Sequence, residues 1–235
     1  MSKEAVIVST ARTPIGKAYR GAFNDTDAPT LGGHVIAEAV KRAGIEAAEV
    51  DDVIMGCAMQ QGSSGANIGR TSGVAAGLPS SVSGMSIDRQ CSSGMMAIAT
   101  AAKQIISDNM PIVIGGGLES ISLVQNEHRN SYRAQDPTVI AKSEHAYMSM
   151  LETAEIVSSR YNVSREQQDE FALQSQQRTA AAQQAGKFDD EIAPLASKML
   201  FVDKETKQQS VHEVNLDKDE GNRPTTTLEG LNGLK

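Results

Sequence analysis

The chain has 235 residues and a net charge of -7, with 40% hydrophobic, 22% charged and 3% aromatic residues. This composition excludes a collagen, a coiled coil and a disordered chain, and the acidic balance argues against nucleic acid as a partner. The sequence contains no apolar run of the ~20 residues that a membrane span needs. Its two cysteines fit a reducing compartment. We therefore expect a soluble cytoplasmic protein without a visible targeting segment.

The first 120 residues predict strands that alternate with helices. Short apolar runs predict buried strands at 5–8, 53–57, 84–87 and 111–114. Apolar residues at helical spacing predict helices at 30–43, 67–76 and 95–106. Thr30 is placed to cap the first helix, and Gly44 to end it in a left-handed conformation. This alternation is typical of a layered α/β domain with a mostly buried sheet.

The composition changes after about residue 120. Residues 121–150 show no clear period, whereas 151–161 have a helical pattern. Ser164 and Gln167 form a capping box at the start of a Gln/Ala-rich helix that ends near Gly186. Residues 197–227 are polar. We interpret this half as a helical and loop-rich insertion rather than a second sheet domain.

Cys91 is the main candidate for chemistry. It lies in the segment Asp-Arg-Gln-Cys-Ser-Ser-Gly at 88–94, between the third predicted strand and the following helix. At such a turn, backbone N–H groups and the positive end of the helix dipole favour a thiolate and can hold an oxyanion. The position alone fits both a nucleophile and a small buried hydrophobic residue. Cys57 lies inside an apolar strand, and we interpret it as core.

Other groups are weaker candidates. Gly115, Gly116 and Gly117 are not followed by the residues of a nucleotide-binding loop, so we interpret them as a tight strand exit. The spacing of the histidines does not indicate a metal site. Each of them fits the general base that a thiol nucleophile needs, and sequence separation leaves the choice open among His34, His128, His145 and His212.

Several segments together resemble the thiolases, which are acetyl-CoA acetyltransferases and 3-ketoacyl-CoA thiolases. Residues 87–94, followed by Met-Ala-Ile at 96–98, resemble the nucleophile segment of that family. Further segments match in collinear order along the whole chain, at 11–16, 115–120, 148–155, 164–172, 186–192 and 223–228.

The resemblance implies a fold and a set of site residues. It implies a layered α-β-α sheet domain over 1–120 and an inserted helical and loop domain over 121–235 that binds coenzyme A. It also implies that Cys91 is catalytic and that Met150 lines the pantetheine channel. Arg223 is implied to lie near the adenine and the phosphates of CoA, with Thr226 close by.

The implied activity is acyl transfer between 3-ketoacyl-CoA and CoA. The Cys91 thiolate attacks the 3-keto carbon, acetyl-CoA leaves, and free CoA takes the acyl group from the enzyme. In the opposite direction two molecules of acetyl-CoA condense. The resemblance also implies a homo-oligomer, a dimer or a tetramer. CoA and acyl-CoA act as substrates, and no cofactor is permanently bound.

The chain departs from the family pattern at several places. It contains no Gly-His-Pro motif, and Cys57 is not in a Cys-x-Gly segment. Ser149 stands where the family often has His, and Ala66 where it usually has Gln. We therefore expect an N-terminal portion that lacks the C-terminal domain and is inactive or nearly so alone. Two alternatives are a related condensing enzyme, of the ketoacyl synthase or hydroxymethylglutaryl-CoA synthase type, and a non-catalytic CoA-binding module.

Overall fold

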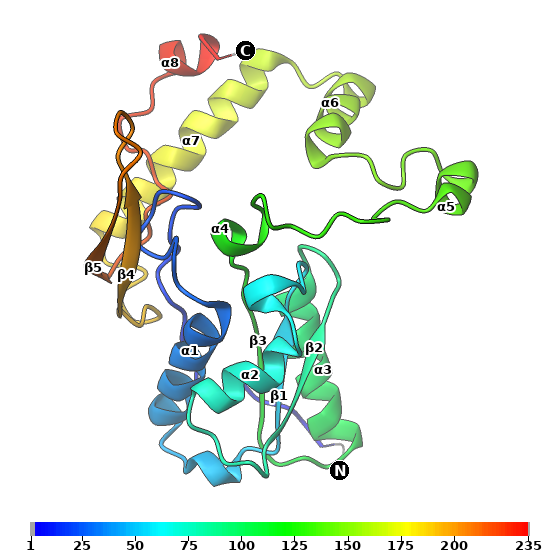
Figure 1. The fold of residues 1–235 in the computed structure, drawn as a ribbon, viewed down its shortest axis with the longest axis vertical. Coiled ribbons are helices and arrows are strands. Elements are labelled where there is room, and N and C mark those ends of the chain that lie inside the picture. The colour runs from blue at the N-terminus through cyan, green and yellow to red at the C-terminus, as the bar shows by residue number, and fades with distance from the viewer. Residues whose placement is uncertain (1–2, 235) are drawn as a thin grey trace. The chain divides into compact units, whose positions relative to one another are not determined.

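Three parallel strands form the larger of two sheets in the described residues. The computed structural model describes residues 3–234. It places β1 (Asp52–Gly56) between β2 (Ser83–Ile87) and β3 (Val113–Gly117), as Figure 1 shows. Parallel neighbours need a crossover connection. The crossovers contain the helices α2 (Ile68–Ala75) and α3 (Ser93–Ser107).

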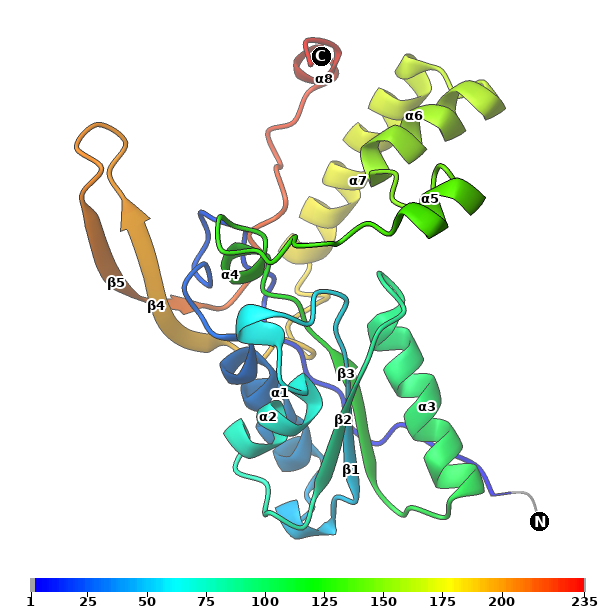
Figure 2. The ribbon, with the colours of Figure 1, turned by 45° about the vertical axis from the view of Figure 1, so that its right-hand side comes forward.

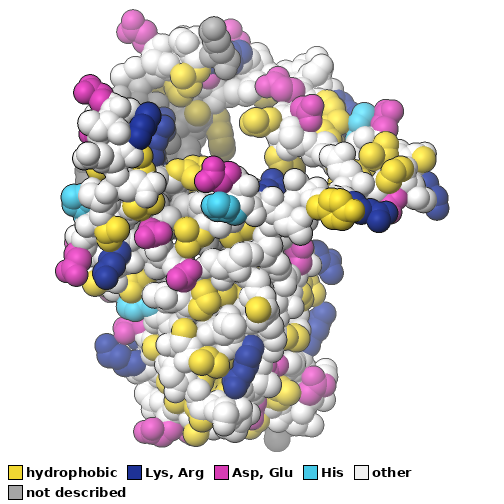
Figure 3. All heavy atoms as spheres, viewed as in Figure 1, with side chains coloured by type: hydrophobic (Ala, Val, Ile, Leu, Met, Phe, Trp, Pro, Cys, Tyr) yellow, Lys and Arg dark blue, Asp and Glu magenta, His cyan; other side chains and the backbone are white. Residues whose placement is uncertain are grey.

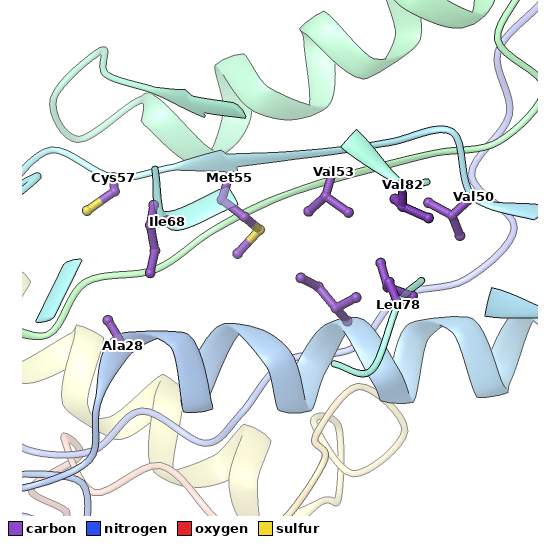
Figure 4. Close-up of a cluster of buried hydrophobic side chains, with 9 residues drawn as sticks. Ala28, Val50, Val53, Met55, Cys57, Ile68, Leu78 and Val82 are labelled. Carbon is purple, nitrogen blue, oxygen red and sulfur yellow. The ribbon is translucent and has the colours of Figure 1, made fainter. Parts of the chain in front are cut away.

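Helices cover both faces of this sheet. Figure 2 shows α1 (Ala28–Ala43) and α2 on one face and α3 on the other. Successive residues of a strand point to opposite faces. Accordingly, Val53 and Met55 of β1 belong to the cluster that faces α1 (Figure 4), whereas Ile54 packs with Ala97 and Ala101 of α3. The predicted layered α/β architecture is confirmed.

The chain packs as two compact units. The first comprises Met1–Arg129 with Asp190–Gly221, and the second comprises Asn130–Asp189 with Asn222–Lys235. The predicted domains, 1–120 and 121–235, are defined by the nucleophile and by CoA binding. Because packing alone does not show which residues bind CoA, that division stays a prediction.

Helix α1 ends as predicted but begins earlier. Gly44 has φ 68°, and its N–H donates to the Lys41 carbonyl at 3.1 Å, which is the left-handed end that a glycine allows. The helix begins at Ala28 with Asp27 as its N-cap, so the prediction that Thr30 caps it is wrong. The reason is Pro29, whose fixed φ and missing N–H suit the first helical turn.

The predicted buried strand at 5–8 is absent. Val6, Ile7 and Val8 are 71–76% exposed, and these residues join no strand ladder. An apolar run predicts burial, but a strand also needs hydrogen bonds to a neighbouring strand. Among the described residues, this segment forms none with the outer edge of β2 or of β3.

A large apolar cavity lies beside this N-terminal segment. Its volume is about 960 Å³, and it is lined by the segment itself and by residues of α1, α3 and β3. Val35 of α1, Ile105 of α3 and Ile114 of β3 are among its walls. Apolar surface of both helices therefore stays uncovered within this unit.

Glycines let α3 lie directly on the strands. A Cβ atom on Gly56 would lie 2.2 Å from the Ser93 carbonyl carbon, and one on Gly117 would lie 2.9 Å from the Gly94 Cα atom. The predicted strand at 111–114 is shifted for the same reason. β3 includes the glycines at 115–117, so their interpretation as a strand exit is wrong. The missing side chains of Gly115 and Gly117 admit the backbone of α3.

Residues 190–221 contain a β-hairpin at 195–216, so the prediction of helix and loop is wrong here. β4 (Leu195–Val202) and β5 (Gln209–Leu216) pair antiparallel, with Lys198 opposite Glu213. Only its base is buried, where Leu195 and Leu216 cluster with Ala22 and Phe23. The outer part carries many polar residues, so its alternation was too weak to be recognised as strands.

Arg12 ties the hairpin segment to the loop that follows residue 11. Its guanidinium donates to both Asp219 carboxylate oxygens, at 2.7 and 3.0 Å, and to Glu191 at 2.7 Å. Asp219 also accepts the Ile15 N–H at 2.7 Å. Burial raises the pKa of Asp219, but the hydrogen bonds from Arg12 and Ile15 outweigh this and hold that pKa below its usual range.

The second unit is helical. Ser164 and Gln167 form the predicted capping box at the start of α7, with hydrogen bonds of 2.9 and 3.3 Å. Arg165 of α7 donates to the Leu231 carbonyl of α8 at 2.7 Å. Exposed hydrophobic side chains lie on α5 and α6, as Figure 3 shows. The helices of this unit are α5 (Pro137–Lys142), α6 (Met150–Tyr161), α7 (Arg165–Gln184) and α8 (Leu228–Asn232).

Three short elements complete the described residues. They are the helix α4 (Ile121–Val124) and the 3-10 turns Ala47–Glu49 and Gly62–Ser64. Among residues 3–234, no helix combines the length and the apolar character needed to cross a membrane.

The contact between Gly56 and α3 predicts a steric effect. Gly56→Ala should lower the free energy of unfolding by about 1–3 kcal/mol, because the new methyl group overlaps the Ser93 backbone. Gly116→Ala is the matched control, since its Cβ would meet only the flexible Met55 Sδ, at 3.3 Å. Urea unfolding of both variants measures the difference. Equal losses would contradict the packing described here.

Candidate active site

Cys91 lies in an exposed loop between β2 and α3. Residues 88–92 are all exposed, whereas the next residue, Ser93, is only 4% exposed. Ser93 is the first residue of α3, and its close contact with Gly56 fixes the helix start at the carboxyl end of β1. The thiol is therefore accessible to reagents and held next to a fixed helix terminus.

The first turn of α3 offers hydrogen-bond donors. The N–H of Met96 donates to the Ser92 carbonyl at 2.9 Å. The N–H groups of Gly94 and Met95 have no acceptor within the part of the chain that the structure describes. Such free donors and the helix dipole favour negative charge at a helix start. This is the local geometry predicted from the sequence, while the catalytic role of Cys91 stays a prediction.

Cys57 lies in the opposite environment. It follows β1 directly and is 1% exposed. Burial, with the charge of Glu119 and a hydrogen bond to it as further causes, raises the pKa of Cys57 to about 12. Cys57 is therefore a neutral core thiol, in agreement with its interpretation from the sequence.

Glu119 and Ser93 were not singled out from the sequence. Glu119 follows β3, and its Oε1 atom accepts the N–H groups of Ala58 and Met59, the latter at 3.3 Å. Ser93 hydrogen-bonds the backbone of the Cys91 loop. The only sequence signal for Ser93 is a hydroxyl residue at a helix start, which is common and not specific.

The histidines of the first unit do not contact the nucleophile candidate. His34 Nε2 lies 3.3 Å from the Ala193 carbonyl oxygen, and His212 Nε2 lies 2.9 Å from the Ser210 hydroxyl. His128 faces Glu127 at 3.6 Å. Among the described residues of this unit, none of the three forms a hydrogen bond with Cys91.

The predicted CoA-binding residues belong to the second unit. Arg223 and Thr226 meet in one turn, where the Thr226 hydroxyl donates to the Arg223 carbonyl at 2.7 Å. The Arg223 N–H donates to Gln176 Oε1 at 2.7 Å, which holds this turn on α7. Met150 is the first residue of α6 and is 73% exposed. Hydrogen bonds in residues 3–234 join Arg223 and Thr226 to each other but not to Met150.

The Arg223 side chain is free to meet a ligand. It is exposed and forms no ion pair with the described residues. A guanidinium offers five donors in a planar fork that matches phosphate oxygens. The role of Arg223 in CoA binding stays a prediction.

Comparison with known proteins shows the family. Residues 5–235 match the family described as "Thiolase, N-terminal domain". A 3-ketoacyl-CoA thiolase of Bacillus subtilis is 40% identical over 233 residues, and an acetyl-CoA acetyltransferase of Cupriavidus necator is 37% identical over 242 residues. The chain belongs to the thiolase family, in the part that corresponds to its N-terminal domain.

A solved structure agrees with this assignment. The crystal structure of the Bacillus anthracis acetyl-CoA acetyltransferase matches with a TM-score of 0.79 and 39% identity, over 100% of this chain and 59% of that one. The two curated relatives are likewise matched over 99% of this chain and 59% of their own length. The chain thus spans about three fifths of the relatives that it matches.

The contrast between the two thiols predicts their reactivity. In the native chain one thiol should react rapidly with Ellman's reagent, because Cys91 is exposed and Cys57 is buried. With a pKa of about 12, only about one Cys57 thiol in ten thousand is ionised near pH 8. Both should react in guanidinium chloride. Cys91→Ser should remove the rapid phase, and a rapid phase that persists in this variant would refute the assignment.

Proposed function

We propose that Cys91 is the nucleophile of a thiolase-type acyl transfer between CoA thioesters. The observation that carries the proposal is an exposed cysteine at the start of α3, within a chain of the thiolase family. The names of the two relatives, 3-ketoacyl-CoA thiolase and acetyl-CoA acetyltransferase, support the substrate class. CoA and acyl-CoA are substrates in this proposal, and no cofactor stays bound.

The first chemical step is thioester exchange at Cys91. The thiolate attacks the carbonyl carbon of acetyl-CoA, a bond from Sγ to that carbon forms, and the bond to the CoA sulfur breaks. CoA leaves as a thiolate, so the negative charge passes from Cys91 to the leaving group. The free N–H groups of Gly94 and Met95 support this step, because donors at a helix start stabilise the developing oxyanion.

In thiolysis the Cys91 sulfur attacks the 3-keto carbon instead of the thioester carbon. The thiolate attacks the 3-keto carbon of a 3-ketoacyl-CoA, and the bond between the second and third carbons breaks. The electron pair of that bond leaves with acetyl-CoA, which takes up a proton, and the shortened acyl group stays on Cys91. Free CoA, after loss of its thiol proton, then removes the acyl group and restores the thiolate.

The second unit supplies CoA binding in this proposal. Arg223 binds phosphate, Thr226 fixes the turn that presents it, and Met150 offers apolar surface to the pantetheine arm. The hydrogen bonds that hold the turn on α7 support this assignment.

We extend the proposal to a homo-oligomer, a dimer or a tetramer, which the exposed apolar residues Val6–Val8 support. Two free cysteines support a reducing, cytoplasmic compartment.

Acetyl transfer to Cys91 tests the central claim. Acetylation is one half-reaction, so prolonged incubation with acetyl-CoA should add one acetyl group even to a chain that is inactive in complete turnover. Peptide mapping should place this group on Cys91. Cys91→Ala should abolish the adduct. Cys57→Ala should retain it, since this thiol is buried. Intact mass spectrometry measures all three proteins.

Two other outcomes separate the alternatives. CoA binding without an adduct would overturn the proposal in favour of a non-catalytic CoA-binding module. Acetylation from an acylated carrier protein but not from acetyl-CoA would overturn it in favour of a carrier-dependent condensing enzyme.

Arg223→Gln tests the CoA site separately. This variant should weaken CoA binding about tenfold, the effect of losing one charge-assisted hydrogen bond to phosphate. Arg178→Gln on α7 is the matched control, because Arg178 is exposed and has no ion pair among residues 3–234. Isothermal titration calorimetry gives both dissociation constants. An equal change in the two variants would show that net charge alone, and not this turn, attracts CoA.

A further inference from the structure

The loop that carries Cys91 has little packing of its own. Residues 88–92 are all exposed, so burial does not fix their backbone. Gln90, directly before Cys91, has φ 48°, in the left-handed region that is unfavourable for a residue with a Cβ atom. An exposed loop with such a residue keeps one conformation only where hydrogen bonds hold it.

Two side chains supply hydrogen bonds of this kind. They add to two backbone bonds of 3.0 Å, from the Ser92 N–H to the Arg89 carbonyl and from the Ser93 N–H to the Gln90 carbonyl. Asp88 Oδ1 accepts the Gln90 N–H at 2.7 Å. The Ser93 hydroxyl accepts the Arg89 N–H at 2.8 Å and donates to the Gln90 carbonyl oxygen at 2.6 Å. That carbonyl belongs to the peptide group that joins Gln90 to Cys91. The orientation of this peptide group therefore sets the direction in which the backbone enters Cys91, and with it the position of the thiol.

Ser93 is a firm anchor for this purpose. It is 4% exposed and is the first residue of α3. Its carbonyl carbon lies against Gly56 of β1, at a distance that leaves no room for a Cβ atom there. The hydroxyl group thus connects the strained exposed loop to the rigid sheet.

We propose that Ser93 is a positioning residue for Cys91, whose hydroxyl holds the Gln90–Cys91 peptide group in the orientation that presents the thiol for acyl transfer. The inference rests on the proposed role of Cys91 as nucleophile. Ser93 acts through the backbone. Both hydrogen-bonding functions of its hydroxyl are used, one as acceptor and one as donor. An alanine side chain can neither accept nor donate these hydrogen bonds, whereas the threonine hydroxyl can do both.

The test compares variants of the full chain in acetylation by acetyl-CoA. Ser93→Ala should lower the limiting acetylation rate by about tenfold or more, because small displacements of a reacting atom are costly. The half-saturating concentration of acetyl-CoA should change by less than about twofold, since the CoA contacts remain. Ser92→Ala is the matched control, as the Ser92 side chain does not cap the helix. It should stay within about twofold of the wild type in both parameters.

A second pair of variants isolates the hydroxyl from its size. Threonine and valine have the same shape, so Ser93→Thr and Ser93→Val differ only in the hydrogen bonds. The Thr variant should acetylate about tenfold faster than the Val variant. Urea unfolding shows whether each variant is folded under the assay conditions. Equal rates for Thr and Val, or a loss in Ser93→Ala that follows only its unfolded fraction, would overturn the inference.

Alkylation by iodoacetamide separates this inference from the proposed function. If the wild-type chain accepts no acetyl group, the proposed function fails, but the alkylation rate of Cys91 still reports its presentation. Ser93→Ala should then be alkylated more slowly than Ser92→Ala. Equal alkylation rates would refute the positioning role. Normal acetylation of Ser93→Ala would refute it while leaving the nucleophile assignment intact.

Discussion

The arrangement of the candidate active site depends on one contact, the backbone of the first turn of α3 against the backbone of β1. Gly56 makes it possible, because any side chain there would overlap the Ser93 carbonyl group. The contact buries Ser93 and fixes the helix start at the carboxyl end of the sheet, where the N–H groups of Gly94 and Met95 have no acceptor among residues 3–234. The loop directly before this buried helix start, with Cys91 in it, is exposed.

The other polar groups of the site lie at the same end of the sheet, where the parallel strands have their carboxyl ends. Cys57 follows β1, the Cys91 loop follows β2, and Glu119 follows β3, so all three lie beyond the carboxyl ends of parallel strands. In open α/β sheets this edge is where ligands bind. The two thiols have opposite environments within this region. One is buried beside a carboxylate and stays protonated, and the other is exposed at the start of a helix.

The second unit and the hairpin segment show how polar contacts hold irregular segments in place. Gln176 of α7 holds Asn222 and Arg223 through three hydrogen bonds of 2.7–3.0 Å. Arg12 performs the equivalent role in the first unit, where it joins the loop after residue 11 to both ends of residues 190–221. In each case a long polar side chain reaches segments that have too little apolar surface to pack by themselves. Removing either partner of a partly buried pair leaves a polar group without its bond.

The sequence by itself determined the features that depend on neighbouring residues. The alternation of strands and helices, the left-handed Gly44, the capping box at Ser164 and the strand-to-helix turn at Cys91 are confirmed. The tertiary structure alone decided the exposure of residues 6–8, the hairpin at 195–216, the glycines inside β3 and the hydrogen bond of the Ser93 hydroxyl to the Cys91 loop. The physical reason is the distance along the chain over which each interaction acts. A cap or a hydrophobic period acts within a few residues, whereas strand pairing and close packing depend on which edge or backbone, distant in the chain, lies opposite.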